Sequence, residues 1–323
     1  MLAAARPGRP ATPSRDDGPA VTLRSRRWEG TVLTDRSVIE GSAMPFVATR
    51  AGRVFYEQRG IGVPVVLLHA TLHDHRDFDL VADRLAARYR TIAVDLPGHG
   101  RSDPVDADRA ADAFLVAEVL ADLVDRLGLA PAVLVGNSVG GFAAARLALD
   151  QPGRVAGLVL VNTAGFTRQT AVSRLTCRVL GIPQASRWIF PRLVPGYMKP
   201  RNDYDRAIAG RVQARARTAE GARVAAALWR SFAAPAFDLR ADGPRLAPPV
   251  LLVWGARDTI LPLAAGRQTH MAIPGSQFRT LDTGHVVFAS DPGGFLEIAE
   301  PFIESASRNK AAGKTSDAVH RNR

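Results

Sequence analysis

The chain has 323 residues, 46% of them hydrophobic and 23% charged, so it is long enough to bury a sizeable core in one large domain or two smaller ones. Its net charge of +11 is carried almost wholly by arginine and forms no basic block within an aromatic-bearing element, which argues against nucleic-acid binding. A single cysteine, Cys177, excludes an intrachain disulfide, and no apolar run reaches the length of a membrane span. With no secretory signal recognised, we expect a cytoplasmic protein that has no membrane partner.

The two ends of the chain are predicted to lie outside the folded core. Residues 1–43 are rich in Pro, Gly, Ser, Arg and Ala without a sustained period, and we expect a disordered extension there. Patterned sequence begins at Met44, so a translation start at Met44 rather than Met1 is a hypothesis. Residues 305–323 are polar and basic, which predicts a flexible tail.

Between the ends, apolar runs alternate with segments of helical spacing. Strands are predicted over 53–58, 64–69, 90–96, 132–135, 155–161, 248–255 and 277–281, and helices over 78–89, 110–127, 138–149 and 293–305. Continuous apolar strands separated by helices are typical of a mostly parallel sheet covered on both faces, an α/β fold. We assign residues 44–164 and 246–304 to this core.

Residues 165–245 interrupt the alternation, because they contain no convincing strand. Their Arg- and Ala-rich helical segments predict a helical lid inserted between two strands, although helices packed on the back of the sheet are an alternative. Trp188 and Trp229 are candidates for an apolar substrate pocket, as are the other lid aromatics Phe190, Tyr197 and Phe232. The same side chains at helical spacing could instead form the lid's own packing.

A glycine-bracketed serine stands between a predicted strand and a predicted helix. The stretch Gly136-Asn137-Ser138-Val139-Gly140 reads G-x-S-x-G. A tight strand-to-helix turn exposes such a serine as a nucleophile, and glycines on either side avoid collisions with the neighbouring elements. We therefore predict Ser138 as the nucleophile and the backbone N–H of Val139 as an oxyanion donor. A packing site for small residues is the alternative.

The partners of such a serine are expected in the order acid, then histidine. Asp258 follows the apolar run VLLVWG, and His285 follows the last short strand, so both lie at predicted carboxyl ends of strands. We predict that His285 takes the proton of Ser138 and that Asp258 orients His285. The neighbours of these residues along the chain, Asn137 and Val286, are expected to line the substrate pocket.

The loop after residues 64–69 is expected to supply the second oxyanion donor. It reads His69-Ala70-Thr71-Leu72, which makes the backbone N–H of Thr71 the candidate, with His69 packed beneath the loop. His73 and His75 resemble a metal-binding pair, but no third ligand of suitable spacing accompanies them. We predict no metal site and assign the two histidines to polar loop contacts.

The sequence resembles the α/β-hydrolase superfamily over roughly residues 46–304. The resemblance rests on VVLLHA, DLPGHGRSD, GNSVGGFAAARLA, VLLVWGARDTILP and TGHVVFASDPGGFLE. It implies an eight-stranded, mostly parallel sheet, a lid between strands six and seven, and no cofactor. It also implies that Ser138, Asp258 and His285 match the family's nucleophile, acid and base. One departure is Ala70, since members commonly have glycine after the histidine of the oxyanion loop.

The expected activity is hydrolysis of a small, hydrophobic ester, lactone or thioester through an acyl-enzyme. GNSVGG also resembles the elbow of hydrolases that cleave carbon–carbon bonds in aromatic ring-fission products, but the chain lacks a Gly-rich oxyanion loop and has Val286 where those enzymes have tryptophan. A member of the fold that binds a small ligand without turnover is a further alternative. A small-molecule substrate is the expected partner of a monomer or homodimer.

Overall fold

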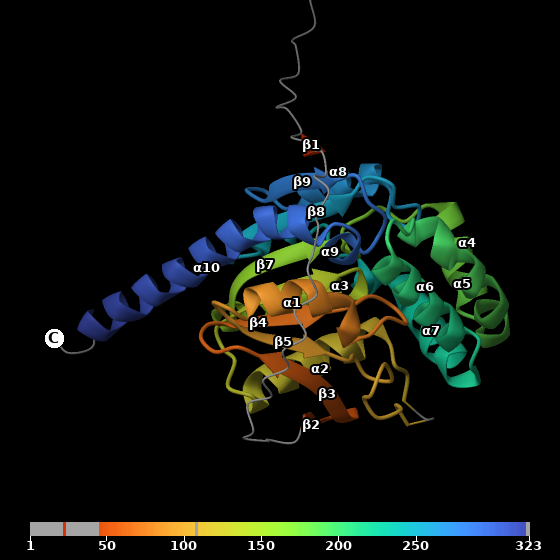
Figure 1. The fold of residues 1–323 in the computed structure, drawn as a ribbon, viewed down its shortest axis with the longest axis horizontal. Coiled ribbons are helices and arrows are strands. Elements are labelled where there is room, and N and C mark those ends of the chain that lie inside the picture. Colours follow the sequence, from red (N-terminus) through yellow and green to blue (C-terminus); the bar gives the residue numbers. More distant parts are fainter. Residues whose placement is uncertain (1–21, 24–44, 107–108, 321–323) are drawn as a thin grey trace, which may run out of the picture.

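One twisted sheet forms the centre of the molecule. The computed structural model describes residues 22–23, 45–106 and 109–320, with side chains for residues 45–106 and 109–308. The strands lie in the order β1-β9-β8-β7-β6-β4-β5-β3-β2 (Figure 1). Their bounds are β1 Thr22–Leu23, β2 Phe46–Thr49, β3 Gly52–Arg59, β4 Pro64–Leu68, β5 Arg90–Val94, β6 Ala132–Asn137, β7 Val155–Val161, β8 Val250–Gly255 and β9 Gln277–Leu281.

The sheet is mixed, with its parallel part in the middle. β4 to β9 pair in parallel, whereas β3 pairs antiparallel with β5 and β2 antiparallel with β3. Eight strands, β2 to β9, correspond to the predicted sheet, and the two-residue β1 adds a ninth beside β9. Every residue of β6, β7 and β8 is buried, as expected for strands covered on both faces.

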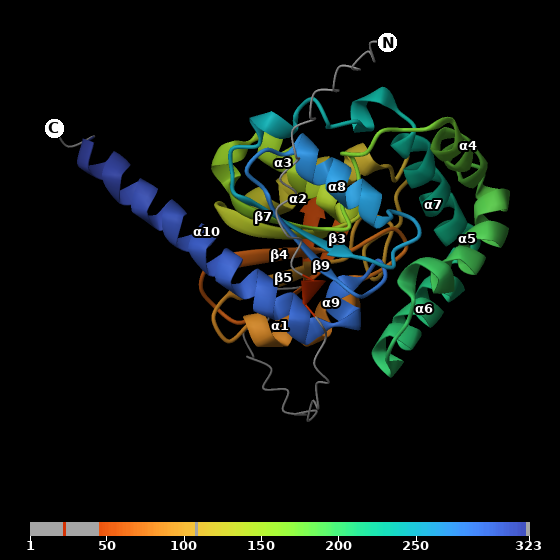
Figure 2. The same ribbon diagram turned by 90° about the horizontal axis from the view of Figure 1, so that it is seen from above.

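Helices cover both faces of this sheet. Figure 2 shows α1 (Asp79–Leu85), α9 (Val287–Ser290) and α10 (Pro292–His320) on one side. On the other side lie α2 (Ala113–Arg126), α3 (Val139–Asp150) and α8 (Leu263–Ala272). The helix α2 begins at the N-cap Asp112, whose carboxylate accepts from two backbone N–H groups, and Gly128 just beyond its end has φ +60°.

Four helices connect β7 to β8. They are α4 (Ala171–Leu180), α5 (Pro183–Met198), α6 (Asp203–Ala216) and α7 (Ala219–Phe232), and they lie together at the side of the molecule away from the end of α10 (Figures 1 and 2). Counted without β1, β7 and β8 are the sixth and seventh strands. The helical segment predicted for residues 165–245 therefore falls between these two strands in the chain.

The chain ends differ from a simple disordered extension and tail. Within residues 1–43 the structure describes Thr22 and Leu23, which pair in parallel with Thr280 and Leu281; the rest of the predicted extension lies outside the described residues. The last helix was expected to end near residue 305, but α10 continues to His320. Lysine, arginine and alanine are frequent there, and these residues have a high intrinsic helix propensity.

Among the residues that the structure describes, no helix combines the length and the apolar character needed to cross a bilayer.

Candidate active site

Ser138 occupies a strained turn between β6 and α3. Its backbone has φ 55° and ψ −114°, a left-handed region that a serine rarely adopts. The turn is held from both sides, because the N–H of Ser138 donates to the carbonyl of Val161 (3.1 Å) and its own carbonyl accepts from Ala164 (3.2 Å) and Phe142 (3.0 Å). The surrounding structure thus maintains the geometry that the G-x-S-x-G pattern predicts.

The glycines of the turn are required by close backbone approaches. A Cβ on Gly136 would lie 2.5 Å from the carbonyl oxygen of Gly140, and a Cβ on Gly140 would lie 2.5 Å from the carbonyl oxygen of Leu68. Both contacts are with backbone atoms, which cannot rotate away. The spacing of the two glycines around Ser138 therefore follows from how tightly α3 crosses β4 and β6.

His285 and Asp258 form a buried pair at the ends of β9 and β8. The Nδ1 of His285 lies 2.5 Å from Oδ2 of Asp258. The other oxygen of Asp258 accepts from the backbone N–H groups of Ile260 (2.8 Å) and Leu261 (3.1 Å). A carboxylate held by backbone donors keeps one imidazole tautomer, with the proton on Nδ1 and Nε2 free to accept another.

Asn162 is a further residue of this site that sequence reasoning missed. Its Nδ2 donates to Oδ2 of Asp258 (2.6 Å), and its Oδ1 accepts from the N–H of Gly255 (2.8 Å). The residue directly follows β7 and has φ 38°, a conformation that asparagine tolerates better than most residues. A polar residue directly after the apolar run 155–161 was the available signal.

Ser138 and His285 line the same cavity, of about 550 Å³, beneath the helices that connect β7 to β8. No hydrogen bond joins the Ser138 hydroxyl to His285 among the described residues, and catalytic contacts of this kind are often open before a substrate binds. Cys177 also lines the cavity, but burial raises the pKa of its thiol to about 11, so it is not a competing thiolate near neutral pH. Five aromatic side chains are part of its wall: Phe190, Tyr197, Trp229, Phe232 and Phe237.

The loop after β4 lies at the mouth of this cavity. Ala70 and Thr71 line the cavity, and a turn closed by the hydrogen bond from His73 N–H to the carbonyl of Ala70 (3.1 Å) places Leu72 at φ 64°. Ala70 itself does not have a positive φ, so glycine is not required where this chain departs from the family pattern. Val139 is the first residue of α3, and its N–H therefore has no acceptor within the helix.

His69 packs beneath the loop after β4 and holds it, as predicted. Its Nε2 accepts from the N–H of Leu96 (3.0 Å), and its Nδ1 donates to the carbonyl of Ala70 (2.7 Å). Burial lowers the pKa of His69, which favours the neutral ring that this pattern needs.

Three predicted pocket residues lie elsewhere. Asn137, the last residue of β6, and Val286, just before α9, are 1% and 0% exposed and do not line the cavity. Trp188 is 67% exposed and lines a separate shallow groove with Arg187 and Arg192. Trp229 lines the cavity, as do the other predicted lid aromatics Phe190, Tyr197 and Phe232.

Asn137 instead holds the histidine loop. Its Nδ2 donates to the carbonyl oxygens of Val161 (3.0 Å) and His285 (3.1 Å). From the other side, the N–H of His285 donates to the carbonyl of Tyr197 (2.9 Å), and the Tyr197 ring meets the imidazole edge-on at 5.5 Å. Contacts from β6 and from the end of α5 thus fix the position of His285.

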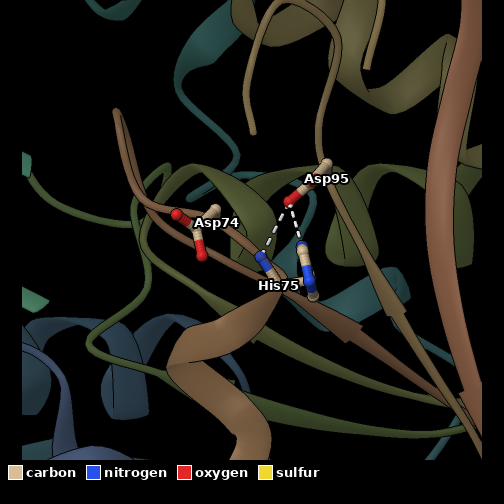
Figure 3. Close-up of side chains that lie close together, drawn as sticks. All are labelled: Asp74, His75 and Asp95. Atoms are coloured by element: carbon tan, nitrogen blue, oxygen red, sulfur yellow. Dashed lines mark hydrogen bonds and ion pairs between the residues drawn. The ribbon is translucent and has the colours of Figure 1, made fainter. Parts of the chain in front are cut away.

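Asp74, His75 and Asp95 gather below the site, close enough together to suggest metal ligands (Figure 3). Their polar atoms already have protein partners: Oδ1 of Asp95 accepts from the N–H and Nδ1 of His75 (both 2.8 Å), and Asp74 binds Arg76. Burial lowers the pKa of His75, but the hydrogen bond and charge of Asp95 outweigh it, so the net pKa is raised. These contacts join the loops after β4 and β5, in keeping with the polar loop role expected for His75.

The comparisons with known proteins agree with this architecture. Residues 65–298 match the model of the Alpha/beta hydrolase family. A protein of uncharacterised function from Mycobacterium tuberculosis is 30% identical over 272 residues, 76% of each chain. A pimeloyl-[acyl-carrier protein] methyl ester esterase from Neisseria meningitidis is 31% identical over 257 residues, 76% of this chain and 94% of that protein.

Two solved structures share the fold. The esterase of Thermogutta terrifontis has a TM-score of 0.71 and 24% identity, covering 81% of this chain and 98% of its own. The enol-lactonase of Burkholderia xenovorans LB400 has a TM-score of 0.70 and 21% identity, covering 80% of this chain and 100% of its own.

Proposed function

The chain belongs to the alpha/beta hydrolase family and is an enzyme of that family; from this premise we propose that it hydrolyses a small, hydrophobic ester, lactone or thioester with Ser138, His285 and Asp258 as a catalytic triad. One observation carries the proposal. A serine in left-handed backbone geometry shares a cavity with a histidine whose Nδ1 is bound to a buried carboxylate. These are the three groups that activation of a hydroxyl nucleophile requires.

In the first half of the reaction, Oγ of Ser138 attacks the substrate carbonyl carbon while Nε2 of His285 takes the hydroxyl proton. The tetrahedral intermediate then collapses, its bond to the leaving group breaks, and the imidazolium gives that proton to the leaving alkoxide or thiolate. Asp258 remains ionised and stabilises the imidazolium through Nδ1. The product of this half is an acyl-enzyme on Ser138.

In the second half, water attacks the acyl carbon and His285 takes one of its protons. Collapse of this intermediate returns the proton to Ser138 and releases the carboxylic acid. The negative oxygen of both intermediates accepts from the backbone N–H of Val139, at the start of α3, and from that of Thr71. Each such donor contributes on the order of 3 kcal/mol to the transition state in serine hydrolases.

The lining of the cavity supports a hydrophobic acyl group. Phe190, Tyr197, Trp229, Phe232 and Phe237 line the cavity, and helices α4 to α7 would act as the lid that keeps water from the acyl-enzyme. Trp229 has no hydrogen-bond partner for its indole N–H among the described residues, so an oxygen of a bound substrate could accept from it. The related esterase from Neisseria supports an ester as the scissile bond.

The direct test is turnover of short p-nitrophenyl esters by the purified chain and by the Ser138→Ala variant, with fluorophosphonate labelling followed by mass. We expect turnover and one label on Ser138, and in the variant we expect a loss of at least about 1000-fold in kcat and no label.

Two outcomes would lead elsewhere. If Ser138 labels but esters, lactones and thioesters are not hydrolysed, whereas a ring-fission dienone is, the carbon–carbon hydrolase is correct. If Ser138 neither labels nor supports turnover of any of these substrates, while ligands still bind the cavity, the chain is a non-catalytic binding protein and the proposal fails.

A further inference from the structure

The outer side of the lid exposes apolar side chains that a soluble surface normally lacks. On α4, Val172, Leu175 and Val179 are 74%, 59% and 37% exposed, and their spacing of three and four residues puts them in one stripe. The same helix turns Cys177 and Leu180 toward the protein. The helix is therefore amphipathic with its apolar stripe outward, the reverse of a helix that serves only the core.

Helix α5 continues this surface. Ile182, just before α5, is 51% exposed, and Trp188 and Ile189 on α5 are 67% and 37% exposed. Both views place α4 and α5 at the outer edge of the molecule (Figures 1 and 2). We call these six apolar residues, together with Arg174, Arg178, Arg187 and Arg192, the α4–α5 surface.

The charge of this surface is one-sided. From residue 163 to residue 202 the sequence contains no aspartate or glutamate, but six arginines and one lysine. The four arginines of the α4–α5 surface are exposed and, in the described part of the chain, pair with no carboxylate, although Arg174, Arg187 and Arg192 donate to backbone carbonyls. Most arginines on the sheet side, among them Arg50, Arg59, Arg154 and Arg257, have carboxylate partners.

This combination selects among possible partners. A second copy of the same surface would bring unpaired arginines against unpaired arginines, which is unfavourable. An acidic protein surface would match the arginines, but acidic side chains would not cover the outward aliphatic stripe and the tryptophan beside it. An anionic bilayer satisfies both, since phosphate groups pair with arginine while aliphatic and indole side chains enter the boundary of the acyl chains.

We propose that the α4–α5 surface docks the enzyme peripherally on anionic phospholipid membranes. Helix α4 also contributes Ser173, Thr176 and Cys177 to the wall of the cavity, and Val172 of the exposed stripe lines the cavity too, so docking brings the lid and the cavity next to the lipid. Membrane-dissolved, amphiphilic substrates would then reach the cavity without crossing bulk water, a consequence that rests on the proposed function. Such docking needs no membrane-spanning segment, and it revises the expectation of no membrane partner.

The experiment is co-sedimentation of the full chain with vesicles of phosphatidylcholine alone or mixed with phosphatidylglycerol. We expect binding to the mixed vesicles that weakens with salt, and little binding to phosphatidylcholine. The variant Leu175→Ser/Val179→Ser/Trp188→Ala should bind at least about tenfold more weakly. The pair Arg174→Gln/Arg178→Gln should weaken binding to the mixed vesicles by a similar factor.

The control variant is Ile61→Ser/Met271→Ser. These two apolar residues are 80% and 73% exposed and lie outside the α4–α5 surface, so binding of this variant to the mixed vesicles should stay within about twofold of the unmodified chain. Circular dichroism and turnover of a short soluble ester verify that each variant is folded. Because co-sedimentation does not depend on turnover, it tests docking even if the proposed activity is wrong. Absence of binding to the mixed vesicles, or equal binding by the triple variant, overturns the proposal. Capture of an acidic carrier protein, but not of vesicles, through the same residues would assign the surface to a protein instead.

Discussion

Two asparagine side chains hold the candidate triad without lining the cavity. Asn162 binds the Asp258 carboxylate, and Asn137 binds the backbone carbonyl of His285. Asn162 also accepts from the N–H of Gly255 at the end of β8, and Asn137 also donates to the carbonyl of Val161 at the end of β7. Groups of this kind fix the orientation of the reacting side chains, so their loss is expected to slow the reaction more than it weakens binding.

Replacement of Asn137 by aspartate tests this role with almost no change in shape. The variant loses both donated hydrogen bonds and sets carboxylate oxygens against two carbonyl oxygens. We expect the free energy of unfolding to fall by about 2 kcal/mol or more, at about 1 kcal/mol for each lost bond. We also expect kcat on p-nitrophenyl esters to fall about tenfold with KM nearly unchanged.

Urea unfolding and steady-state kinetics of Asn137→Asp provide these values. An unaltered urea midpoint together with a raised KM and normal kcat would instead mean that residue 137 contacts substrate, as the sequence alone suggested.

The contrast between Ser138 and its neighbour shows where sequence reasoning stops. Residue type and order along the chain were sufficient to predict that Ser138, Asp258 and His285 lie at neighbouring strand ends, because strand ends of a parallel sheet meet at one edge. Adjacency was misleading for Asn137 and Val286, since the direction of a side chain depends on the local backbone rather than on distance along the chain.

At the scale of elements, the turn from β6 into α3 makes a sharp prediction about glycine. In Gly140→Ala the new Cβ would lie 2.5 Å from the carbonyl oxygen of Leu68, a backbone atom of the central β4. We expect a loss of about 3 kcal/mol or more in the free energy of unfolding, or no soluble protein. Gly153→Ala is the matched control, because a Cβ there meets nothing within 4 Å.

Urea unfolding of both variants measures the difference. Equal stability of the two would mean that α3 can shift away from β4, and the strained geometry of Ser138 would then not be maintained by this packing.

Strands were easier to predict than the helices that connect β7 to β8. The buried strands β4, β7 and β8 are continuous apolar runs, which periodicity and composition identify. Helix α5 contains Pro191 and Pro195, residues that usually mark helix ends, so its faces could not be assigned from spacing. That is why Trp188 was placed in the pocket, whereas tertiary packing leaves it outside.

Across the whole molecule, ionic contacts divide the chain into two regions. The sheet and its covering helices carry arginines paired with nearby acids, as in Arg50 with Asp122 and Arg257 with Asp282. The α4–α5 surface carries arginines and exposed aliphatic side chains, and the sequence has no acidic residue from 163 to 202. The net charge of +11 therefore says little by itself about a binding partner. A partner is suggested instead by where arginines without acidic partners lie beside exposed apolar side chains.

The N-terminal segment provides a prediction at this scale. The two-residue β1 adds a ninth strand beside β9, whereas β2 to β9 already contain the elements that hold Ser138, Asp258 and His285. A chain that begins at Met44 should therefore keep its ester turnover per active site. Its free energy of unfolding should fall by at most about 2 kcal/mol, the value of a few backbone hydrogen bonds.

The full chain carrying Leu23→Pro separates pairing from the rest of the segment, because proline removes one N–H that could donate to β9. If the shortened chain and Leu23→Pro have similar urea midpoints, β1 pairing accounts for the contribution of residues 1–43 to stability. If the shortened chain loses turnover or aggregates while Leu23→Pro does not, the segment protects the open edge of β9 by more than this pairing, and residues before Met44 belong to the functional fold.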